Sequence, residues 1–317
     1  MLKIAFHTPQ IDIRGSCTAI FDYAYYNEKI LGNNSIIVLP YSSIDESKND
    51  LIAIRKFQKY FYVYFYKNYS ELDSILSNCN IFYQIHYGKR ENSYLSRLKN
   101  VIHCVFDLSE PHGDVYASVS DVLGNKFGIN LYVPHMVGLP PSETGENLRN
   151  ELGISESATV FGYHGGSDAF NIDFVKDIIK KVIRENKDLY FIFVNTPRFD
   201  HHSNIFFLEK LTINEDKNKF ICSCDAMIHA QKLGETFGLS IAEFSVNNKP
   251  IITYGGWTWN TNHKNILGDK AIYYTENNLY DILTNFDKNI YINTDLNCYK
   301  EFSPDNVMKK FKEVFID

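Results

Sequence analysis

The chain has 317 residues, of which 44% are hydrophobic and 22% are charged, and its formal net charge is −6. This length suits two domains of about 150 residues, each with enough apolar side chains to form a core. Lysines and arginines are scattered along the chain and are fewer than the acidic residues, 32 against 38, which argues against a nucleic acid or an anionic membrane surface as the partner. We therefore expect a small-molecule substrate.

Cysteine usage and hydropathy restrict the class of protein further. The six cysteines lack the paired spacing of a zinc site, so we expect buried free thiols. No stretch reaches the roughly 18 apolar residues of a membrane span, and the chain begins with a strand-like segment, Leu2–Phe6, instead of a basic and apolar leader. The expectation is a cytoplasmic protein without a membrane span.

Short apolar runs alternate with helix-like patterns through the first half of the chain. Strands are expected at Leu2–Phe6, Ser35–Leu39, Tyr60–Tyr66, Ile81–Ile85, Val101–Phe106 and Asn130–Val133. Helices are expected at Thr18–Leu31, Asp45–Lys59, Ser70–Ser77, Ser93–Leu98 and Val115–Lys126. This alternation is typical of a doubly wound parallel sheet, in which ligands bind beyond the carboxyl ends of the strands. The aromatic run Tyr60–Tyr66 fits either a carbohydrate-stacking platform or a strand buried on both faces, and its shortness favours the buried strand.

A patternless, proline-rich segment, Pro134–Ser142, separates the two halves and is interpreted as an interdomain linker. The expected domains are residues 1–137 and 151–301, joined by residues 138–150. Residues 302–317 are expected to form a C-terminal helix with Ser303 as its cap. The strands expected in the second half are Ala158–Gly162, Tyr190–Asn195, Ala226–His229 and Pro250–Thr253, with Cys222 and Cys224 also in a strand, and the first helix is expected at Asn171–Arg184.

The segment Asp225–Thr253 carries the strongest functional signal, because it predicts a strand, a loop, a helix and a second strand in succession. The N–H groups at a helix start are unpaired and carry partial positive charge, so the amides around Phe237–Ser240 suit a phosphate. Glu235 in the loop and Glu243 about two helical turns further on offer acceptors for sugar and ribose hydroxyls. A capping box formed by Ser240 and Glu243 is an equally simple structural explanation.

The pattern Glu235-x7-Glu243, wrapped around Phe237-Gly238-Leu239 and followed by Asn248-Lys249-Pro250-Ile251-Ile252, resembles the paired-glutamate motif of GT-B glycosyltransferases, most closely the retaining family 4 type. The resemblance implies two Rossmann-like domains facing across a cleft, with an N-terminal acceptor domain, a C-terminal nucleotide-sugar donor domain and a C-terminal helix that crosses back to the N-terminal domain. It implies that Glu235 contacts the donor sugar as a catalytic residue and that Glu243 contacts the nucleotide ribose. The amides implied to hold the diphosphate are those of Thr236, Phe237, Gly238 and Leu239.

The resemblance also implies donor contacts in other loops. A glycine-containing loop after the first strand, here Gly15 and Ser16, is implied to face the diphosphate, although Ser16 also fits a plain helix cap. Asn195, at the end of a strand, lies where the family contacts the nucleotide. The loop that follows the first strand of the second half contains Gly165, which suits an anion nest.

The chain departs from the family at the catalytic histidine, which the family places directly before an aspartate. Here Phe106 precedes Asp107, so the candidate for that role is His112 or, failing that, His103.

A second departure concerns the arginine and lysine that the family places on the diphosphate. Tyr163 and Asp168 occupy those positions here. Another cation must supply the missing charge. The candidates are His164, Lys232 and Arg198.

These observations predict a retaining glycosyltransferase that moves a sugar from a nucleotide-diphosphate donor to a hydroxyl acceptor, such as a glycan. No metal cofactor is expected, because the sequence lacks the paired carboxylates after a strand that metal-dependent transferases use. A non-catalytic nucleotide-sugar-binding pseudoenzyme is the alternative, motivated by Phe106, Tyr163 and Asp168, and a nucleotide-sugar epimerase of the same architecture is a third hypothesis. Trp257 and Trp259 fit either an exposed rim against the acceptor or ordinary packing.

Overall fold

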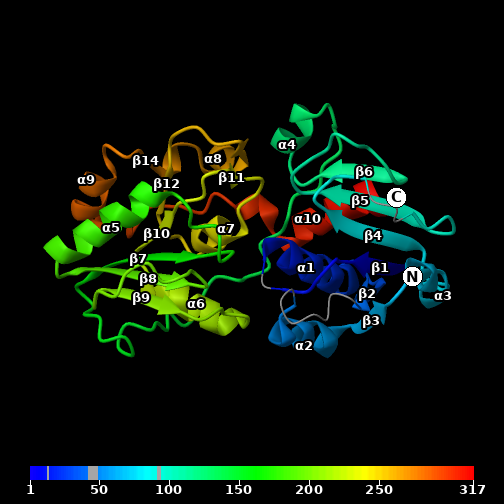
Figure 1. The fold of residues 1–317 in the computed structure, drawn as a ribbon, viewed down its shortest axis with the longest axis horizontal. Helices are drawn as coiled ribbons and strands as arrows, with labels where there is room; N and C mark the ends of the chain where they lie inside the picture. Colours follow the sequence, from blue (N-terminus) through cyan, green and yellow to red (C-terminus); the bar gives the residue numbers. More distant parts are fainter. Residues whose placement is uncertain (13, 42–48, 91–93) are drawn as a thin grey trace. The chain divides into compact units, whose positions relative to one another are not determined.

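The structure, a computed structural model, describes residues 1–12, 14–41, 49–90 and 94–317 (Figure 1). The chain forms two compact units: unit 1 contains Met1–Gly138 and Glu301–Asp317, and unit 2 contains Leu139–Lys300. Each unit is built on one six-stranded sheet in which all neighbouring strands pair in parallel. The predicted α/β class with a parallel sheet in each half is confirmed.

The sheet of unit 1 has the strand order β3-β2-β1-β4-β5-β6, which is the order of a Rossmann sheet. Its strands are β1 Lys3–His7, β2 Asn34–Pro40, β3 Tyr62–Tyr66, β4 Ile81–His86, β5 Lys99–Cys104 and β6 Val115–Ser118. The helices are α1 Gly15–Lys29, α2 Leu51–Tyr60, α3 Leu72–Ile75, α4 Asp121–Lys126 and α10 Pro304–Phe311, with 3-10 turns at Tyr69–Glu71 and Lys300–Phe302 and a π-helical end at Lys312–Ile316.

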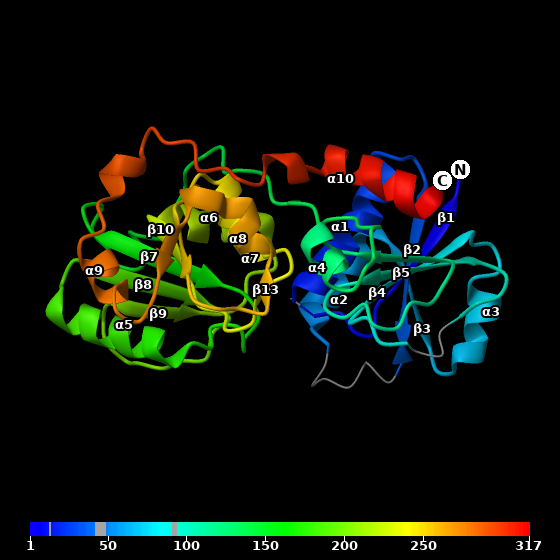
Figure 2. The same cartoon turned by 90° about the horizontal axis from the view of Figure 1, so that it is seen from above.

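Helices cover both faces of this sheet. Side chains of α1, α2, α4 and α10 pack with the strands in one large cluster of buried residues, and α3 covers the opposite face with a smaller cluster. Figure 2 shows α10 beside α1, so both ends of the chain lie in unit 1. The predicted cap of the C-terminal helix is confirmed, because the Ser303 side chain accepts a hydrogen bond from the N–H of Asn306.

The aromatic run in unit 1 corrects a prediction. We expected Tyr60–Tyr66 to be a strand buried on both faces, but β3 is an edge strand that pairs only with β2. Tyr62 is 76% exposed and Tyr64 is 40% exposed. Hydrophobicity alone does not distinguish a central strand from an edge strand, because that difference depends on which strands pair with it.

Two predicted helices of unit 1 are wrong in part. The segment Val115–Lys126 begins as strand β6, and its helix starts only after Ser120, whose hydroxyl accepts from the N–H of Leu123. The helix expected at Asp45–Lys59 starts at Leu51, because the Asp50 carboxylate accepts from the first-turn amides. Residues 42–48 lie outside the described part of the chain.

Two further short elements of unit 1 also differ from the prediction. Residues 94–98 form turns instead of the expected helix, and the predicted start of that helix, Ser93, lies outside the described residues. The strand expected at Asn130–Val133 is reduced to a single bridge between Tyr132 and Ser118.

The sheet of unit 2 repeats the same topology in the order β14-β12-β10-β7-β8-β9. Its strands are β7 Thr159–His164, β8 Leu189–Val194, β9 Ile205–Leu208, β10 Ala226–His229, β12 Ile251–Tyr254 and β14 Ile272–Tyr274. The helices are α5 Asp173–Glu185, α6 Asn214–Ser223, α7 Leu239–Val246, α8 Asn262–Leu267 and α9 Leu279–Thr284, with 3-10 turns at Gly268–Lys270 and Lys288–Tyr291. Two very short strands, β11 Gly234–Glu235 and β13 Asn260–Thr261, pair with each other beside the main sheet.

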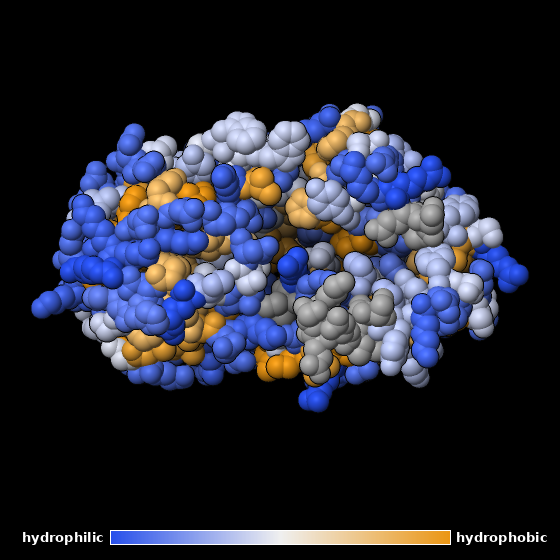
Figure 3. Space-filling model, viewed as in Figure 1, coloured by the Kyte–Doolittle hydropathy of each residue, from blue (hydrophilic) through white to orange (hydrophobic). Residues whose placement is uncertain are grey.

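Cys222 and Cys224 were expected in a strand, but they lie at the end of α6 and just after it. All six cysteines are free thiols, as predicted, and four of them are buried, namely Cys17, Cys79, Cys104 and Cys224. In the part of the chain that the structure describes, no helix has the length and apolarity needed to cross a bilayer. On the face shown in Figure 3, hydrophilic side chains predominate and the strongly hydrophobic ones form small, separate patches.

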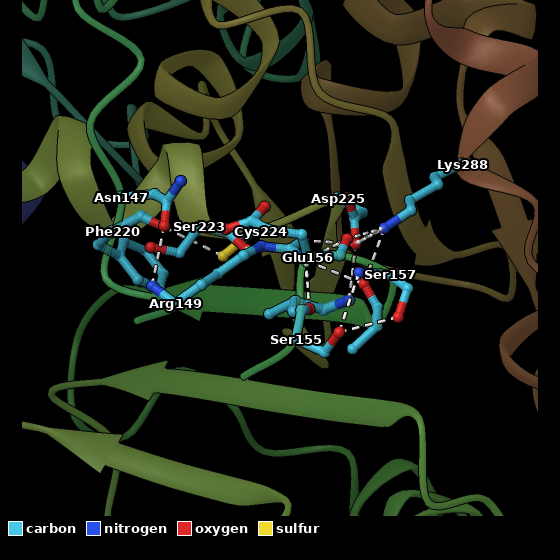
Figure 4. A network of polar contacts seen from close by, with 12 residues as sticks. Asn147, Arg149, Ser155, Glu156, Ser157, Phe220, Ser223, Cys224, Asp225 and Lys288 are labelled. Carbon is cyan, nitrogen blue, oxygen red and sulfur yellow. Dashed lines mark hydrogen bonds and ion pairs between the residues drawn. The ribbon is translucent and has the colours of Figure 1, made fainter. Parts of the chain in front are cut away.

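A buried arginine joins the amino ends of β7 and β10 in unit 2 (Figure 4). Arg149 is 4% exposed, and its guanidinium donates to the carbonyl oxygens of Ser223 and Ala158, both at 3.0 Å. It also donates to Oδ2 of Asp225 at 2.8 Å. Lys288 adds a hydrogen bond of 2.8 Å to the same Ala158 carbonyl. This network fixes the end of the sheet that lies opposite the carboxyl ends of the strands.

Candidate functional site

The predicted site residues of the second half gather at the carboxyl ends of β7 and β10. These two strands are neighbours in the sheet, and the strand order reverses between them, which is where ligands bind in open α/β sheets. His164 ends β7 and His229 ends β10. The loop after β10 contains Glu235 and leads into α7, so strand order alone brings the candidate groups to one edge of the sheet.

Helix α7 begins without a side-chain cap. Gly238 precedes it with a left-handed backbone, φ 84° and ψ 65°, which a side chain would disfavour. Ser240 is the second residue of the helix and does not cap it, so the capping-box alternative is wrong. Among the described residues no side chain caps the N–H groups of the first turn, which carry the partial positive charge of the helix start.

Two side chains hold the loop before α7 by its carbonyl groups. The amide of Asn262 donates to the carbonyl of Thr236 at 2.9 Å, and the Tyr299 hydroxyl donates to the carbonyl of Phe237, also at 2.9 Å. Because the carbonyl and N–H of one trans peptide point in opposite directions, the N–H groups of Phe237 and Gly238 point away from Asn262 and Tyr299. These N–H groups thus lie on the side of the loop opposite Asn262 and Tyr299, which is the side on which an anion would bind.

Glu243 is buried in α7 and paired with two cationic or potentially cationic groups. Its Oε1 lies 2.6 Å from Nζ of Lys217, and its Oε2 lies 3.0 Å from Nε2 of His164. Burial alone would raise the pKa of the Glu243 carboxyl, but Lys217 and His164 outweigh burial and lower that pKa from its ordinary 4.5 to about 2. Both oxygens are therefore already engaged, and a ribose contact at Glu243 has to share them.

Lys217 is the functional candidate that the sequence prediction missed. It lies on α6, one turn before the buried residues Phe220 and Ile221, so it belongs to the inward face of that helix. A buried lysine usually has a carboxylate partner. The sequence signal for Lys217 is therefore its place three and four residues before the apolar residues Phe220 and Ile221, on the same face of a helix.

Glu235 is half-buried and lies in β11, before the loop that leads into α7. Its Oε1 is 3.3 Å from Nε2 of His229, whose other ring nitrogen is 2.9 Å from the Thr253 hydroxyl. The backbone N–H of Glu235 donates to Nδ1 of His263 at 3.2 Å. Burial, and then the neighbouring His229, lower the pKa of His263 to about 2, so this ring is neutral and its Nδ1 is free of a proton. Two histidines and a threonine thus fix the position of Glu235.

The loop after β7 is joined to the end of β8. Asn195 has a positive φ of 54°, and its side-chain amide donates to the carbonyl of Gly165 at 2.8 Å. Tyr163, which stands where the resemblance places an arginine, is 1% exposed and packs against Phe170 with ring centroids 4.9 Å apart. The structure therefore brings Gly165 and Asn195 together but points Tyr163 into the core.

The other two candidate cations have different surroundings. Lys232 is exposed, and its backbone N–H donates to Oδ1 of Asn171 at 2.8 Å. Arg198 lies over the ring of Phe207, 5.0 Å from its centroid. The lysine that contacts one of the paired glutamates is Lys217.

The candidates in the first half lie in unit 1. Gly15 and Ser16 are the first two residues of α1, and the residue before them provides no side-chain cap, so the interpretation of Ser16 as a cap is wrong. His112 packs its ring against His86 and Tyr116, with centroids 5.7 and 5.4 Å away. The Nε2 atom of His112 has no hydrogen-bond partner within the described part of the chain.

His103, the second candidate for the missing histidine, has a structural environment. It is fully buried, with Nδ1 2.6 Å from the Tyr83 hydroxyl and Nε2 2.8 Å from the carbonyl of Val133. Burial lowers the pKa of His103 to about 4. Phe106 is 45% exposed and packs against Tyr87.

No protein-family model and no curated protein sequence matches the chain. Solved structures are similar to it over its whole length. Anabaena Alr3699/HepE in complex with UDP and glucose is 13% identical with a TM-score of 0.75 and coverage of 99% of each chain. A glycosyltransferase from Rickettsia africae ESF-5 is 13% identical with a TM-score of 0.68, covering 100% of this chain and 99% of its own. A mutant of S. aureus TarM in complex with Fondaparinux, alpha-GlcNAc-glycerol and UDP is 10% identical with a TM-score of 0.70 and full coverage of both chains. At these identities the likeness establishes the fold, which is GT-B.

Proposed function

We propose that this protein is a glycosyltransferase that moves a sugar from a nucleotide-diphosphate-sugar donor to a hydroxyl acceptor. The observation that carries the proposal is the uncapped start of α7, which lies between Glu235 on one side and the ion-paired Glu243 and Lys217 on the other. The N–H groups of an uncapped helix start suit a diphosphate, and Glu235 offers an acceptor to a sugar hydroxyl. The similar HepE structures, one with UDP and glucose and another with UDP-glucose, support this type of donor.

The charge requirement of a diphosphate defines a role for Lys217. A donor diphosphate brings roughly two negative charges, and a helix start supplies only about half a positive charge. Lys217 is held against α7 by Glu243, about one turn after the start of the helix, and His164, which also pairs with Glu243, adds a second positive charge when it is protonated. We assign Glu243 to hold these two groups in place, in addition to its proposed contact with the ribose.

The proposed chemistry is transfer with retention of the anomeric configuration. The amides of α7 and Lys217 stabilise the charge that develops on the leaving diphosphate, which removes the need for a metal ion at that step. Glu235 contacts the sugar whose bond breaks, so its interaction changes most between ground state and transition state. His112 is the proposed substitute for the histidine that the family places before Asp107, and the accepting group is a hydroxyl of a glycan or of another acceptor.

The first prediction tests donor binding without metal. UDP at a hundredfold excess over its Kd should raise the melting temperature by roughly 5 °C, because a ligand that binds only the folded state adds about 2.7 kcal/mol to its stability. The shift should be equal with EDTA and with added magnesium, since amides and Lys217 carry the charge. Differential scanning fluorimetry measures it. A shift seen only with a divalent ion would contradict the metal-free proposal.

The second prediction separates binding from turnover. Glu235→Gln removes the carboxylate charge but keeps the shape, so it should lower the rate of UDP-glucose hydrolysis by about 10- to 100-fold while leaving UDP affinity nearly unchanged. Calorimetry gives the affinity, and release of UDP gives the rate. Glu276→Gln, at an exposed glutamate of the same unit, is the matched control and should change neither. A parallel loss of UDP affinity in Glu235→Gln would place this residue on the nucleotide instead of the sugar.

A non-catalytic nucleotide-sugar binder is the second candidate function. Tyr163 is buried in the core where the family has an arginine, and this observation favours a site with a weakened cationic clamp. Hydrolysis of UDP-glucose separates the two functions, because transferases slowly transfer the sugar to water. UDP binding without any hydrolysis would favour the binder.

A further inference from the structure

The only two tryptophans of the chain lie on one exposed surface of unit 2. Trp257 is 77% exposed and Trp259 is 53% exposed, whereas Thr258 between them is 4% exposed. This alternation is that of an extended segment, in which every second side chain points to the same side. These exposed fractions favour the interpretation as an exposed rim, and both indoles contribute apolar area to the surface of the unit.

The backbone that carries the two indoles is held firmly. The Thr258 hydroxyl donates to the carbonyl of Asn260 at 2.9 Å, and Nζ of Lys264 donates to the carbonyl of Gly256 at 2.6 Å. A Cβ atom on Gly256 would clash with the ring of Tyr254, so a larger residue there would have to displace that side chain. The indoles are thus presented on a fixed turn, which lowers the entropy that a ligand must overcome.

The two rings form a corner. Their centroids are 6.4 Å apart and their planes meet at 70°. The backbone of Leu233, a residue that is 61% exposed, is joined to the end of this segment, because its carbonyl accepts from the N–H of Asn260 at 2.8 Å. Each indole offers a broad apolar face and one N–H donor. A pyranose ring has the matching chemistry, since its C–H groups form an apolar face and its hydroxyls accept hydrogen bonds.

This surface is continuous with the residue proposed to contact the donor sugar. Strand β13, which starts directly after Trp259, pairs with β11, where Gly234 is opposite Asn260 and Glu235 is opposite Thr261. A membrane surface fits less well, because interfacial binding to anionic lipids relies on a basic face and the chain carries a net charge of −6. A neutral, hydroxyl-rich ligand suits a small aromatic corner with few charges.

We propose that Trp257, Trp259 and Leu233 form a saccharide subsite, which holds a sugar residue of the acceptor. This inference rests on the proposed function, because it places an acceptor sugar beside Glu235. Stacking on the exposed faces of the two indoles supplies the affinity, and the indole N–H of Trp257 orients the sugar through one of its hydroxyls. The reacting donor sugar itself belongs to the site at α7, so the subsite determines which acceptor is used.

The test uses the intrinsic fluorescence of the whole protein, since both tryptophans report on this surface alone. Maltohexaose, cellohexaose and chitohexaose are titrated separately without donor, alongside vesicles of equimolar phosphatidylcholine and phosphatidylglycerol. We expect a saturable change in emission with at least one saccharide. Trp257→Ala and Trp259→Ala should each weaken that binding about tenfold, measured by calorimetry. Tyr62→Ala, at an exposed aromatic residue of unit 1, is the matched control and should bind like wild type.

Each outcome decides the proposal. No saturable response to any of the three saccharides overturns it, and a blue shift with vesicles alone assigns the surface to lipid and overturns it as well. Saccharide binding that survives both tryptophan substitutions also overturns it. The UDP melting shift is measured on the same samples. A UDP shift without a saccharide response refutes the subsite but not the transferase, whereas a saccharide response without a UDP shift refutes the proposed donor site and leaves the subsite standing.

Discussion

Replacing Lys217 with methionine should lower the free energy of unfolding at neutral pH by about 3 kcal/mol. The substitution keeps the aliphatic stem but leaves the Glu243 carboxylate, which is 5% exposed, without the ammonium 2.6 Å from its Oε1. Removing one partner of a buried ion pair costs several kcal/mol because the other charge stays buried without compensation. Urea denaturation of both proteins, extrapolated to water, measures the difference.

The pH dependence of this loss has a definite sign. The folded pKa of Glu243, about 2, lies below its ordinary 4.5, so the ionised carboxylate contributes stability that is fully present above about pH 4.5 and is lost as the pH falls through about 2. The gap in stability between wild type and Lys217→Met should therefore stay constant from about pH 6 to 8. Below about pH 4.5 it should shrink, because protonated Glu243 no longer needs the lysine.

Lys219 provides a matched control on the same helix. Its Nζ lies 2.9 Å from Oε2 of Glu146, but the two side chains are 39% and 59% exposed. Exposed ion pairs contribute little to stability, so Lys219→Met should unfold almost like wild type. An equal loss in both variants would mean that the effect comes from the α6 helix itself and not from the buried pair.

The general architecture follows from the sequence because local signals determine it. Short apolar runs alternating with helical patterns predict parallel sheets, and each observed sheet agrees with that pattern. The glutamates and the turn at Gly238 were also visible, since the motif is contiguous. By contrast, the motif does not reveal the partner of Glu243. Lys217 is 26 residues away in sequence and comes close to Glu243 through the packing of α6.

Other differences arise where one local pattern fits two topologies. The run Tyr60–Tyr66 has the composition of a central strand. In the described part of the chain, β3 pairs with β2 on one side and lies at the end of the sheet, which makes it an edge strand. The spacing of Ser240 and Glu243 fits a capping box, but the residue before the helix is Gly238, two residues earlier than a Ser240 cap requires. The pairing of β3 is a tertiary property that no window of sequence contains, and the loop before α7 is held by Asn262 and Tyr299, which lie outside the motif.

Replacing Arg149 with methionine should destabilise the protein by about 3 to 5 kcal/mol. Arg149 lies in a stretch that reads as irregular, yet its guanidinium is buried and donates to Oδ2 of Asp225 at 2.8 Å. The same Oδ2 accepts the N–H of Val160 at 2.8 Å, which ties the network to the first strand of the unit. Without the arginine, the ion pair that Asp225 keeps among the described residues is the one with Lys288, at 3.8 Å, and the carbonyl of Ser223 loses its guanidinium donor.

Two further variants show whether geometry or charge is responsible. Arg149→Lys keeps the charge, but a single ammonium cannot replace a planar fork that reaches Ser223, Ala158 and Asp225 at once, so most of the loss should remain. Lys300→Met is the matched control, since Lys300 pairs with Asp295 at 2.7 Å but the two side chains are 57% and 58% exposed, and it should cost at most about 1 kcal/mol. Full recovery of stability in Arg149→Lys would contradict the geometric explanation.

The position of this network also predicts what the substitution leaves intact. Arg149 acts at the amino ends of β7 and β10, whereas His164, His229 and the start of α7 lie at the carboxyl ends of the same strands. Below its lowered melting temperature, Arg149→Met should therefore bind UDP with nearly the affinity of wild type, while Lys217→Met should lose affinity about tenfold or more because it removes a charge-assisted contact. Calorimetry at a temperature where both variants are folded compares them. Equal losses of UDP affinity would show that the carboxyl-end site depends on the stability of the whole sheet and would remove Lys217 from the donor site.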